Sequence, residues 1–376
     1  MQMKAAVLHE IGLPRPYAES RPLHIETLQL DPPGPGEILV RVRAAGLCHS
    51  DLSVINGDRP RPMPMALGHE AAGEVPECGP GVEDMQKGDH VVMVFVPSCG
   101  HCLPCAEGRP ALCEPGAAAN GKGALLSGGH RLHDNHGHDV NHHVGVSAFA
   151  EYAVLSRSSV VKIDKELPWE QAALFGCAVL TGVGAVVNTA QMKPGTKAAV
   201  IGLGGVGLNS LLGAILCGAE QIVAIDLLDS KLDMARQLGA TDAFNAKDAD
   251  IVEKVREATK GGVDYAFEMA GSVPALELAY KITKRGGMTV TAGLANPTKS
   301  MSLSPVVLVA EERTLKGSYV GGCVPLRDIP RYIEMFRRGR LPVDRLLSER
   351  IEGLEGINAA FDRLADGVSI RQVIIP

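Results

Sequence analysis

Residues 197–226 read KAAVIGLGGVGLNSLLGAILCGAEQIVAID, and this stretch decides the fold of the second half of the chain. Residues 197–201 predict a strand, residues 206–217 a helix that ends at Gly218, and residues 222–225 a second strand. Three later segments repeat the alternation and extend it into a parallel sheet covered by helices on both faces: 263–267, 273–282 and 288–291.

The turn between the first strand and the helix has the pattern G-x-G-x-x-G, formed by the residues Gly202, Gly204, Gly205, Val206 and Gly207 around Leu203. The first glycine permits a tight turn, the second lets the backbone approach a pyrophosphate, and the last lets the helix pack close to the strand. The free N–H groups and the dipole at the start of the helix favour phosphate. In this context the pattern predicts a dinucleotide-binding Rossmann domain.

Asp226 ends the second strand, nineteen residues after Gly207. A carboxylate there would accept hydrogen bonds from the adenosine ribose hydroxyls and would repel a 2′-phosphate. The next residues are Leu227 and Leu228 rather than arginine. The predicted cofactor is therefore NAD(H) rather than NADP(H).

Length and charge set the class of protein. A chain of 376 residues is long enough for two domains, and a net charge of −6 without a basic block gives no footprint for nucleic acid or an anionic membrane. Residues 198–219 carry no charge but contain six glycines and divide into a strand and a helix, so we expect no membrane span. Residues 1–12, MQMKAAVLHEIG, have no uninterrupted apolar stretch, so we expect no secretion signal and a cytoplasmic location.

The first hundred residues have the composition of a β-rich fold, with β-branched runs such as 38–42 and 90–96 between turn clusters. Residues 114–141 lack periodicity, so we expect a long surface loop. Six histidines lie between His130 and His143. No cysteine or flanking carboxylate pattern fixes a metal geometry there, so we expect a polar surface rather than a further metal site.

Residues 98–113, SCGHCLPCAEGRPALC, contain four cysteines in the spacing C-x2-C-x2-C-x7-C: Cys99, Cys102, Cys105 and Cys113. Four thiolates with this spacing can complete a tetrahedral zinc site. In a bacterial iron–sulfur run, three residues and then Cys-Pro would follow the third cysteine, which is not the case here, and a reducing compartment disfavours disulfides. We therefore predict a structural zinc with no open position, and we place His101 outside its coordination sphere.

Three separated stretches offer a second donor set: GLCHSDLS at 46–53, LGHEAAGEV at 67–75 and ALFGCAVLTG at 173–182. Their Cys48, His69 and Cys177 would form a Cys2His set with an open fourth position, one of the designs of catalytic zinc. Such a zinc binds an alcohol oxygen, lowers its pKa and holds the alkoxide for hydride loss. Spacing alone leaves open that Cys177 is a small buried apolar residue.

Taken together, these motifs resemble the zinc-dependent alcohol dehydrogenase branch of the medium-chain dehydrogenase/reductase family, over nearly the whole chain. The matching features are the Cys48–Asp51 stretch, Gly68–Glu70 with Gly73, Gly88–Asp89, the four-cysteine loop, Cys177, the glycine turn, Asp226 and Lys231. The resemblance implies an α/β protein in which a GroES-like β-rich catalytic domain, residues 1–178 and 322–376, contains an inserted Rossmann domain, a doubly wound parallel sheet at 179–321.

The resemblance also implies roles for single residues. Glu70 would lie close behind the catalytic zinc, and Asp51 would fix the tautomer of the ligand imidazole. Ser50 would take the substrate proton and pass it on through the nicotinamide ribose. His49 and Arg371 would contact the pyrophosphate. Lys231, Ala292 and Val320 would contact other parts of the cofactor, and Phe95 would form one wall of the substrate pocket. The alternatives are that His49 is simply exposed and that Phe95 belongs to the core.

Some positions depart from the family pattern. Ser53 stands where some members end a proton relay with a histidine, which leaves the last step to water or His49. Pro76 interrupts an expected strand and predicts an edge or a bulge. No cation follows the last loop cysteine, where the chain reads Glu114-Pro115-Gly116-Ala117, and this disfavours a glutathione adduct as substrate.

The predicted function is reversible, NAD-dependent oxidation of an alcohol to an aldehyde or ketone, with two zinc ions in each subunit. Three alternatives stay open: an S-(hydroxymethyl)glutathione (formaldehyde) dehydrogenase of the same family, a zinc-independent quinone reductase, and a non-catalytic NAD or redox sensor. Small side chains at Ala292 and Val320 favour bulky or aromatic alcohols. The resemblance also favours a homodimer paired through the Rossmann domains, with a tetramer as the second choice.

Overall fold

A computed structural model describes all residues, 1–376. The chain divides into two compact units, one formed by Met1–Cys177, Val324–Ile333 and Val343–Pro376, the other by Ala178–Cys323 and Glu334–Pro342. These limits differ from the predicted domain limits mainly at 334–342, which group with the second unit.

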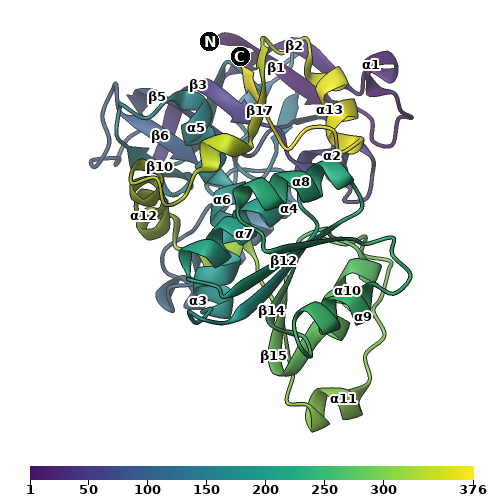
Figure 1. The fold of residues 1–376 in the computed structure, drawn as a ribbon. Helices are drawn as coiled ribbons and strands as arrows, with labels where there is room; N and C mark the ends of the chain where they lie inside the picture. The colour runs from purple at the N-terminus through teal and green to yellow at the C-terminus, as the bar shows by residue number, and fades with distance from the viewer. The chain divides into compact units, whose positions relative to one another are not determined.

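The first unit is β-rich. It contains a closed barrel of five strands in the order β1 (Gln2–Leu8), β2 (Leu23–Leu30), β7 (Leu132–His133), β8 (Asp139–His142) and β4 (Met65–Ala66). Its larger sheet has the order β10 (Val160–Ile163), β6 (His90–Met93), β5 (Ala71–Cys78), β3 (Glu37–Gly46), β18 (Arg371–Ile375) and β17 (Leu347–Glu352), with β9 (Tyr152–Ser156) also paired to β3. Figure 1 shows both ends of the chain in this unit.

Short helices connect and cover these strands. They are α1 (Tyr17–Ser20), α2 (His49–Ile55), α3 (Leu103–Ala106), α4 (Glu114–Gly121), α5 (Trp169–Ala173) and α13 (Ile357–Ala365), while α12 (Pro325–Arg337) begins in the first unit. A buried apolar cluster joins strands and helices, and in it the ring of Phe149 packs edge-on against Phe361, with centroids 6.0 Å apart.

The expectation of one long surface loop at 114–141 is wrong, because this stretch contains α4, β7 and β8. The thiol of Cys113 accepts a hydrogen bond from the Gly116 N–H (3.3 Å), which caps the start of α4. His136 and His138 are exposed as expected, but His142 and His143 are 1% and 3% exposed. The polar-surface prediction therefore fails for these two residues.

Pro76 lies in β5, between β3 and β6, rather than on an edge strand. In the β3–β5 pair, Leu39 lies opposite Glu77 and Arg41 lies opposite Glu74, so β5 has one residue more than β3 between these two pairs. This is the bulge that the proline predicted. The bulge removes the need for a donor at Pro76, because the paired positions on either side carry the ladder.

The second unit contains a six-stranded sheet in the order β13 (Asp242–Asn245), β12 (Gln221–Asp226), β11 (Lys197–Ile201), β14 (Val263–Glu268), β15 (Thr283–Thr291) and β16 (Thr314–Gly317). All neighbouring strands are parallel, which confirms the predicted doubly wound sheet. The helices α7 (Gly205–Leu216) and α8 (Asp229–Leu238) lie on one face, and α9 (Ile251–Ala258) and α10 (Val273–Ile282) lie on the other (Figure 1). The remaining helices are α6 (Ala178–Gly184), which continues as one π-helical segment to Ala190, and α11 (Pro305–Ala310).

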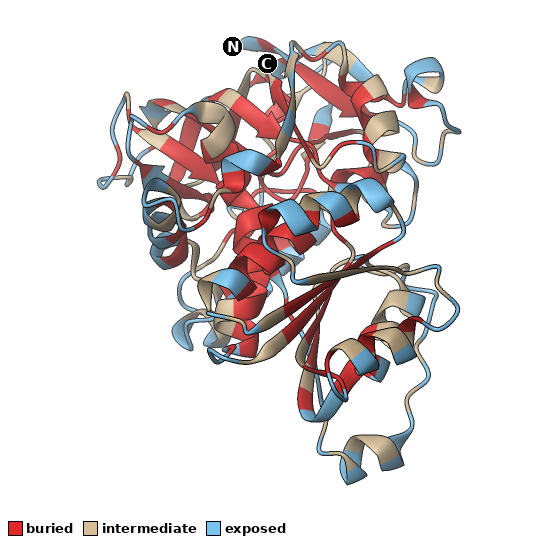
Figure 2. Cartoon of the chain, in the orientation of Figure 1, coloured by how far each residue is buried: buried red, intermediate tan, exposed pale blue.

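In the second unit the apolar strands are buried and the charged helix faces are exposed. The strands β11 and β12 are almost wholly buried, and the charged outer faces of α8 and α9 are exposed (Figure 2). No single helix of the chain is long and apolar enough to cross a membrane. Only one bent pair of helical segments, Trp169–Gly176 with Ala178–Ala190, has the length and apolar composition of a span when the two are taken together.

The carboxylate of Asp362 in α13 fastens α1 to the first unit. It accepts hydrogen bonds from the backbone N–H groups of Tyr17 and Ala18, both at 2.9 Å, and from Arg15 at 3.1 Å. Burial acts to raise the pKa of Asp362, but these donors outweigh it and hold the pKa below its usual range.

Replacing Asp362 by Asn should lower the free energy of unfolding by about 1–3 kcal/mol at pH 7, since charge-assisted hydrogen bonds are lost. A carboxyl group whose pKa is lower in the folded protein stabilises the fold at pH values above its unfolded-state pKa of about 4. This stabilisation is lost as the pH falls through the pKa of the folded state. Thermal unfolding followed from pH 7 to pH 3 should show wild type and Asp362→Asn converge at the acidic end. Asp366→Asn, which touches only Arg15, is the matched control. A constant difference across the range would contradict the assignment.

Candidate active site

Three buried residues from distant parts of the first unit come together. Cys48 caps the start of α2, His69 lies between β4 and β5, and Cys177 follows a short 3-10 turn before α6. One ligand atom from each lies within 4.8 Å of the others, and all three residues are buried. The sequence predicted this group, and the fold brings it together.

The His69 ring is oriented for metal binding. Its Nδ1 lies 2.9 Å from Oδ1 of Asp51, while its buried Nε2 makes no hydrogen bond. A carboxylate on one ring nitrogen fixes the tautomer and presents the other nitrogen to a metal. Two thiols and such an imidazole fit a zinc ion with one position left for a substrate.

The charges in this group are strongly coupled. The hydrogen bond from Cys177 and the His69 imidazole hold the pKa of the Cys48 thiol well below its usual range, against burial. Burial acts to lower the pKa of His69, but Asp51 and Cys48 raise it to about 10. The Cys48 thiolate and the Asp51 carboxylate therefore favour a positive charge at this point, which a metal ion supplies when it displaces the proton of His69.

Asp51 contacts a second imidazole that sequence reasoning missed. His143 Nδ1 lies 3.2 Å from the same Oδ1 atom that bonds His69, and the two rings meet edge-on with centroids 5.6 Å apart. The other oxygen, Oδ2, accepts a hydrogen bond from the Cys48 N–H at 3.3 Å. Asp51 is thus hydrogen-bonded to the His69 ring and to the Cys48 N–H, and the His143 ring adds an ion-pair contact at 3.2 Å. No local pattern marked His143, because the alternation that buries Val140 and His142 along β8 would place residue 143 on the opposite face.

His143→Gln should weaken zinc retention at the Cys48–His69–Cys177 group by about 10–100-fold, as for other residues that orient a ligand. The rate at which a chelator removes zinc from the purified protein measures this. His142→Gln is a matched control, because the adjacent imidazole is equally buried but accepts a bond from the Arg131 N–H instead. Equal chelator rates in both variants would show that His143 does not act through Asp51.

Glu70 and Arg371 form a buried ion pair beside this group, and their side chains are 0% and 4% exposed. Gly46 makes room for the pair, because a Cβ at that position would overlap the Glu70 carboxylate. Glu70 directly follows His69, the predicted ligand, and its role behind a zinc ion stays a prediction. The role of Arg371 as a pyrophosphate contact stays a prediction; within the first unit it neutralises Glu70.

The neighbouring predicted residues lie on α2 and after β6. Ser50 is half-buried and His49 exposed, both in the first turn of α2. Ser53 Oγ donates to the His49 carbonyl at 2.7 Å, so its hydroxyl is tied to the helix. The Phe95 ring meets the His69 ring edge-on, with centroids 5.1 Å apart. Phe95 therefore lies against the predicted metal ligand, as a pocket wall would.

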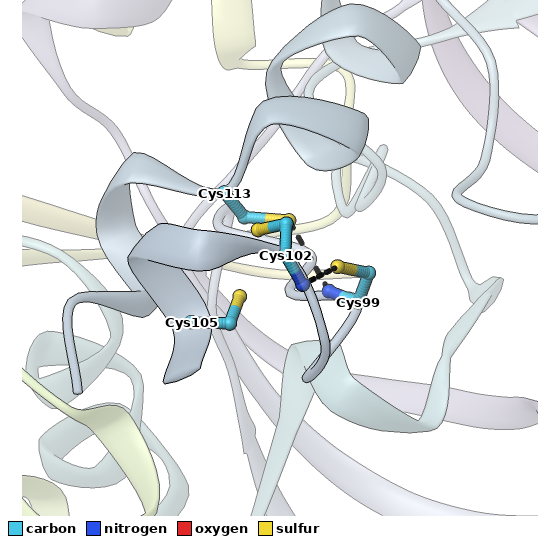
Figure 3. A group of neighbouring side chains, drawn as sticks. All are labelled: Cys99, Cys102, Cys105 and Cys113. Carbon is cyan, nitrogen blue, oxygen red and sulfur yellow. Dashed lines mark hydrogen bonds between the residues drawn. The ribbon is translucent and has the colours of Figure 1, made fainter. Parts of the chain in front are cut away.

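The second cysteine group has the arrangement of a closed metal site. The sulfur atoms of Cys99, Cys102, Cys105 and Cys113 lie within 4.8 Å of one another (Figure 3). Backbone N–H groups of Cys99 and Cys102 donate to the sulfurs of Cys113 and Cys99, at 3.2 and 3.3 Å. Such donors stabilise thiolates, so the four residues fit a structural zinc. His101 is exposed and its Nδ1 bonds the Cys99 carbonyl at 2.8 Å, outside the group.

The glycine turn in the second unit has the backbone that phosphate binding requires. Gly202 has φ +87°, and a Cβ there would meet the Ala270 nitrogen at 2.6 Å. A Cβ on Gly207 would overlap the Gly202 carbonyl, whereas at Gly204 it would point into open space. The start of α7 is thus open at Gly204, with no side-chain cap on its N–H groups.

Asp226 sits beside this turn at the end of β12. Its carboxylate accepts hydrogen bonds from the N–H groups of Leu203 (2.7 Å) and Leu228 (3.0 Å). Each oxygen keeps a further lone pair, so the residue can still accept from ribose hydroxyls. Lys231 lies on α8, two positions after that helix begins, and is half-buried.

Ala292 and Val320 follow the carboxyl ends of β15 and β16, the edge at which ligands bind to open parallel sheets. Val320 has φ +50°, and Gly321 and Gly322 continue in the same left-handed region. A β-branched residue in that conformation is strained, and such strain is typical of functional backbone.

Two family models match the chain: "Alcohol dehydrogenase GroES-like domain" over residues 34–165 and "Zinc-binding dehydrogenase" over residues 205–338. An S-(hydroxymethyl)glutathione dehydrogenase of Synechocystis sp. is 39% identical over all of both chains, and a putative alcohol dehydrogenase D of Mycobacterium tuberculosis is 40% identical over the same share. The crystal structure of benzyl alcohol dehydrogenase from Acinetobacter calcoaceticus is similar at a TM-score of 0.92 and 32% identity, over 100% of this chain and 99% of that one. These matches confirm the predicted fold class, and the chain belongs to the zinc-dependent alcohol dehydrogenases of the medium-chain dehydrogenase/reductase family.

Proposed function

We propose that this protein oxidises an alcohol to an aldehyde or ketone with NAD+, reversibly, at the Cys48–His69–Cys177 group. The observation that carries the proposal is the buried donor set, in which Asp51 fixes the His69 ring and leaves Nε2 directed away from Asp51. When bound there, zinc supplies the Lewis acidity that makes an alcohol proton easier to remove. The Cys99–Cys113 group supports a second, structural zinc.

The residues around the donor set take the substrate proton, orient the His69 ring and bind the cofactor. Ser50, in the first turn of α2, takes the substrate proton at its hydroxyl oxygen. Asp51 and His143 hold the imidazole of His69 in one orientation, and the ring of Phe95 excludes water from one side of it. In the second unit the Gly202–Gly207 turn and the start of α7 bind the NAD pyrophosphate, and Asp226 binds the adenosine ribose.

A second candidate is oxidation of S-(hydroxymethyl)glutathione. The observation in its favour is that a relative with this name matches the chain over its whole length. Against it, the first turn of α4 presents Glu114 after the last loop cysteine, where a cation would be expected to bind the glutathione carboxylate. The aromatic-alcohol alternative is supported by the similarity to benzyl alcohol dehydrogenase and by the small side chains at Ala292 and Val320.

An NAD-linked assay with ethanol, benzyl alcohol, a terpenoid alcohol and S-(hydroxymethyl)glutathione tests the proposal. We expect the highest kcat/KM with an aromatic or other bulky alcohol and a lower value with S-(hydroxymethyl)glutathione. A reversed order would select the formaldehyde route instead. NAD binding without turnover of any of the four compounds would overturn the enzymatic proposal and favour a sensor.

Asp226→Ser should change the choice of cofactor. Removing the carboxylate removes the like-charge repulsion of a 2′-phosphate, so the preference for NAD+ over NADP+ should fall by about 100-fold, the equivalent of roughly 3 kcal/mol. The ratio of kcat/KM for the two cofactors measures this. Asp229→Ser, three residues further on and exposed on α8, is the control and should leave the ratio unchanged. An unchanged ratio in Asp226→Ser would place the ribose elsewhere.

We also propose a homodimer paired through the second unit. Strand β16 is paired on one side only, and all its residues are exposed. Large apolar side chains are exposed on this strand and on the preceding helix α11: Leu315 at 36%, Val306 at 70% and Val309 at 75%. A second copy adding its own β16 would pair this edge and cover these side chains. Light scattering should give twice the chain mass for wild type and the monomer mass for Val309→Asp.

Two further parts of the sequence prediction stay proposals. The two compact units support the domain limits 1–178 with 322–376 and 179–321.

Nine cysteines without a disulfide among them support a cytoplasmic location, where thiols stay reduced.

A further inference from the structure

A cluster of two imidazoles and a carboxylate lies on the barrel of the first unit, apart from both cysteine groups. His9 directly follows the last residue of β1, and His24 and Glu26 lie two positions apart on β2, the strand paired with β1. One ligand atom from each of the three residues lies within 4.8 Å of the others.

The three side chains are already arranged around one point. His9 Nε2 lies 2.7 Å and His24 Nδ1 3.8 Å from the same Oε1 atom of Glu26. The two rings lie with centroids 5.4 Å apart and planes at 58°. Ligand atoms around a tetrahedral zinc are separated by roughly 3.3 Å, given bonds of about 2.0–2.1 Å. The two observed distances bracket this value, so small side-chain rotations suffice to close the site.

The charge environment also favours a cation. No lysine or arginine pairs with Glu26, whose ion-pair partners are the two imidazoles alone. The side chains of His9, His24 and Glu26 are 45%, 55% and 32% exposed, so a hydrated ion can reach them. Neutral imidazole nitrogens with one carboxylate oxygen are donors that suit divalent ions of the zinc type.

The histidines of residues 130–143 differ in this respect. His133 already uses both ring nitrogens, on Asp31 and on Asp139, each at 3.0 Å. His138 pairs with Asp134 alone, and no three donors of this stretch by themselves converge within 4.8 Å. Its high histidine content therefore does not make it a better candidate.

We propose that His9, His24 and Glu26 form a third metal site, which binds Zn2+ or a similar divalent ion and closes the end of the β1–β2 ladder. The bound ion joins residue 9 to β2 beyond the last ladder pair, Leu8 with Leu23. Since it binds the folded strand pair and not the unfolded chain, it stabilises the first unit by mass action.

Equilibrium dialysis of the purified holoenzyme against Zn2+ from ~1 µM to ~100 µM, with zinc counted per chain, tests the site. We expect two tightly held ions and a third that fills within this range in wild type. His24→Gln and Glu26→Gln should bind the third ion at least about tenfold more weakly, as expected when even an outer partner is lost. A double variant His136→Gln with His138→Gln, which changes exposed imidazoles outside the cluster, should keep it.

Thermal unfolding with and without added zinc gives a second readout. The midpoint should rise with zinc in wild type and in the His136/His138 double variant, and the rise should be lost in His24→Gln. A third ion that persists in His24→Gln but disappears from the double variant would place adventitious binding at residues 130–143 and overturn the site. Absence of any third ion up to ~100 µM would overturn it as well. Neither result bears on alcohol oxidation, because the two cysteine-ligated ions are counted separately.

Discussion

His69→Ala should reduce kcat/KM for alcohol oxidation by about a thousandfold or more while leaving NAD binding in place. Losing the Lewis acid removes several kcal/mol of transition-state stabilisation, and ~4 kcal/mol corresponds to about a thousandfold in rate. The imidazole cannot be replaced locally, because His69 is the one imidazole whose ligand atom lies within 4.8 Å of both Cys48 and Cys177. Steady-state kinetics should show the loss of kcat/KM, the zinc content should fall by one ion per chain, and an NADH titration should show that cofactor binding is retained.

Two variants make this result interpretable. His101→Ala changes an exposed imidazole beside the other cysteine group and should leave turnover unchanged. Cys48→Ala should reproduce the loss, whereas Cys78→Ser, at the end of β5 and outside both groups, should not. Retained activity in a His69→Ala protein that lacks this zinc would refute the mechanism, because the reaction would then not need the metal.

Cys102→Ser should remove one zinc per chain and cause a large loss of stability. Apparent binding free energies at structural zinc sites reach ~10 kcal/mol, and three remaining thiolates retain part of it, so a loss of several kcal/mol is expected. Cys102 is the N-cap residue of α3, and the substitution keeps its backbone N–H, which donates to the Cys99 sulfur, so the change removes one sulfur ligand and leaves that bond in place. Zinc content and the thermal midpoint are the measurements.

The order of losses distinguishes the two metals. In Cys102→Ser the remaining zinc should stay at Cys48, His69 and Cys177, and turnover at low temperature should persist after the midpoint has fallen. Cys217→Ser, in the second unit and outside both groups, is the control for a cysteine change alone. If Cys102→Ser instead abolished turnover with folding and dimer mass intact, the structural and catalytic assignments would be exchanged.

Local chemistry explains why so much could be predicted. The Gly202–Gly207 turn, its two strands and α7 lie within thirty consecutive residues, and backbone freedom with apolar periodicity specifies them without help from distant contacts. The four cysteines of 98–113 are equally local. The resemblance then connected Cys48, His69 and Cys177, which are too far apart in sequence for spacing to identify.

The predictions that were wrong concerned segments whose structure depends on contacts with residues distant in sequence. Residues 114–141 have a weak pattern of their own, and the contacts that order them come from other strands, such as the pairing of β7 with β2 and of β8 with β4. Pro76 was placed at a bulge correctly, but whether its strand was central or at an edge depended on which strands flank it.

The sequence by itself therefore determined the family, the parallel sheet, the glycine turn and the two groups of metal-ligating residue types, because each follows from short-range pattern or from a recognisable motif. Only the tertiary structure decided that His143 shares the Asp51 carboxylate with His69, that Glu70 pairs with Arg371, and that His9 meets His24 and Glu26. The physical reason is that these contacts join residues as far apart in sequence as Glu70 and Arg371, and no local periodicity or propensity encodes which side chains a folded chain brings within hydrogen-bond distance.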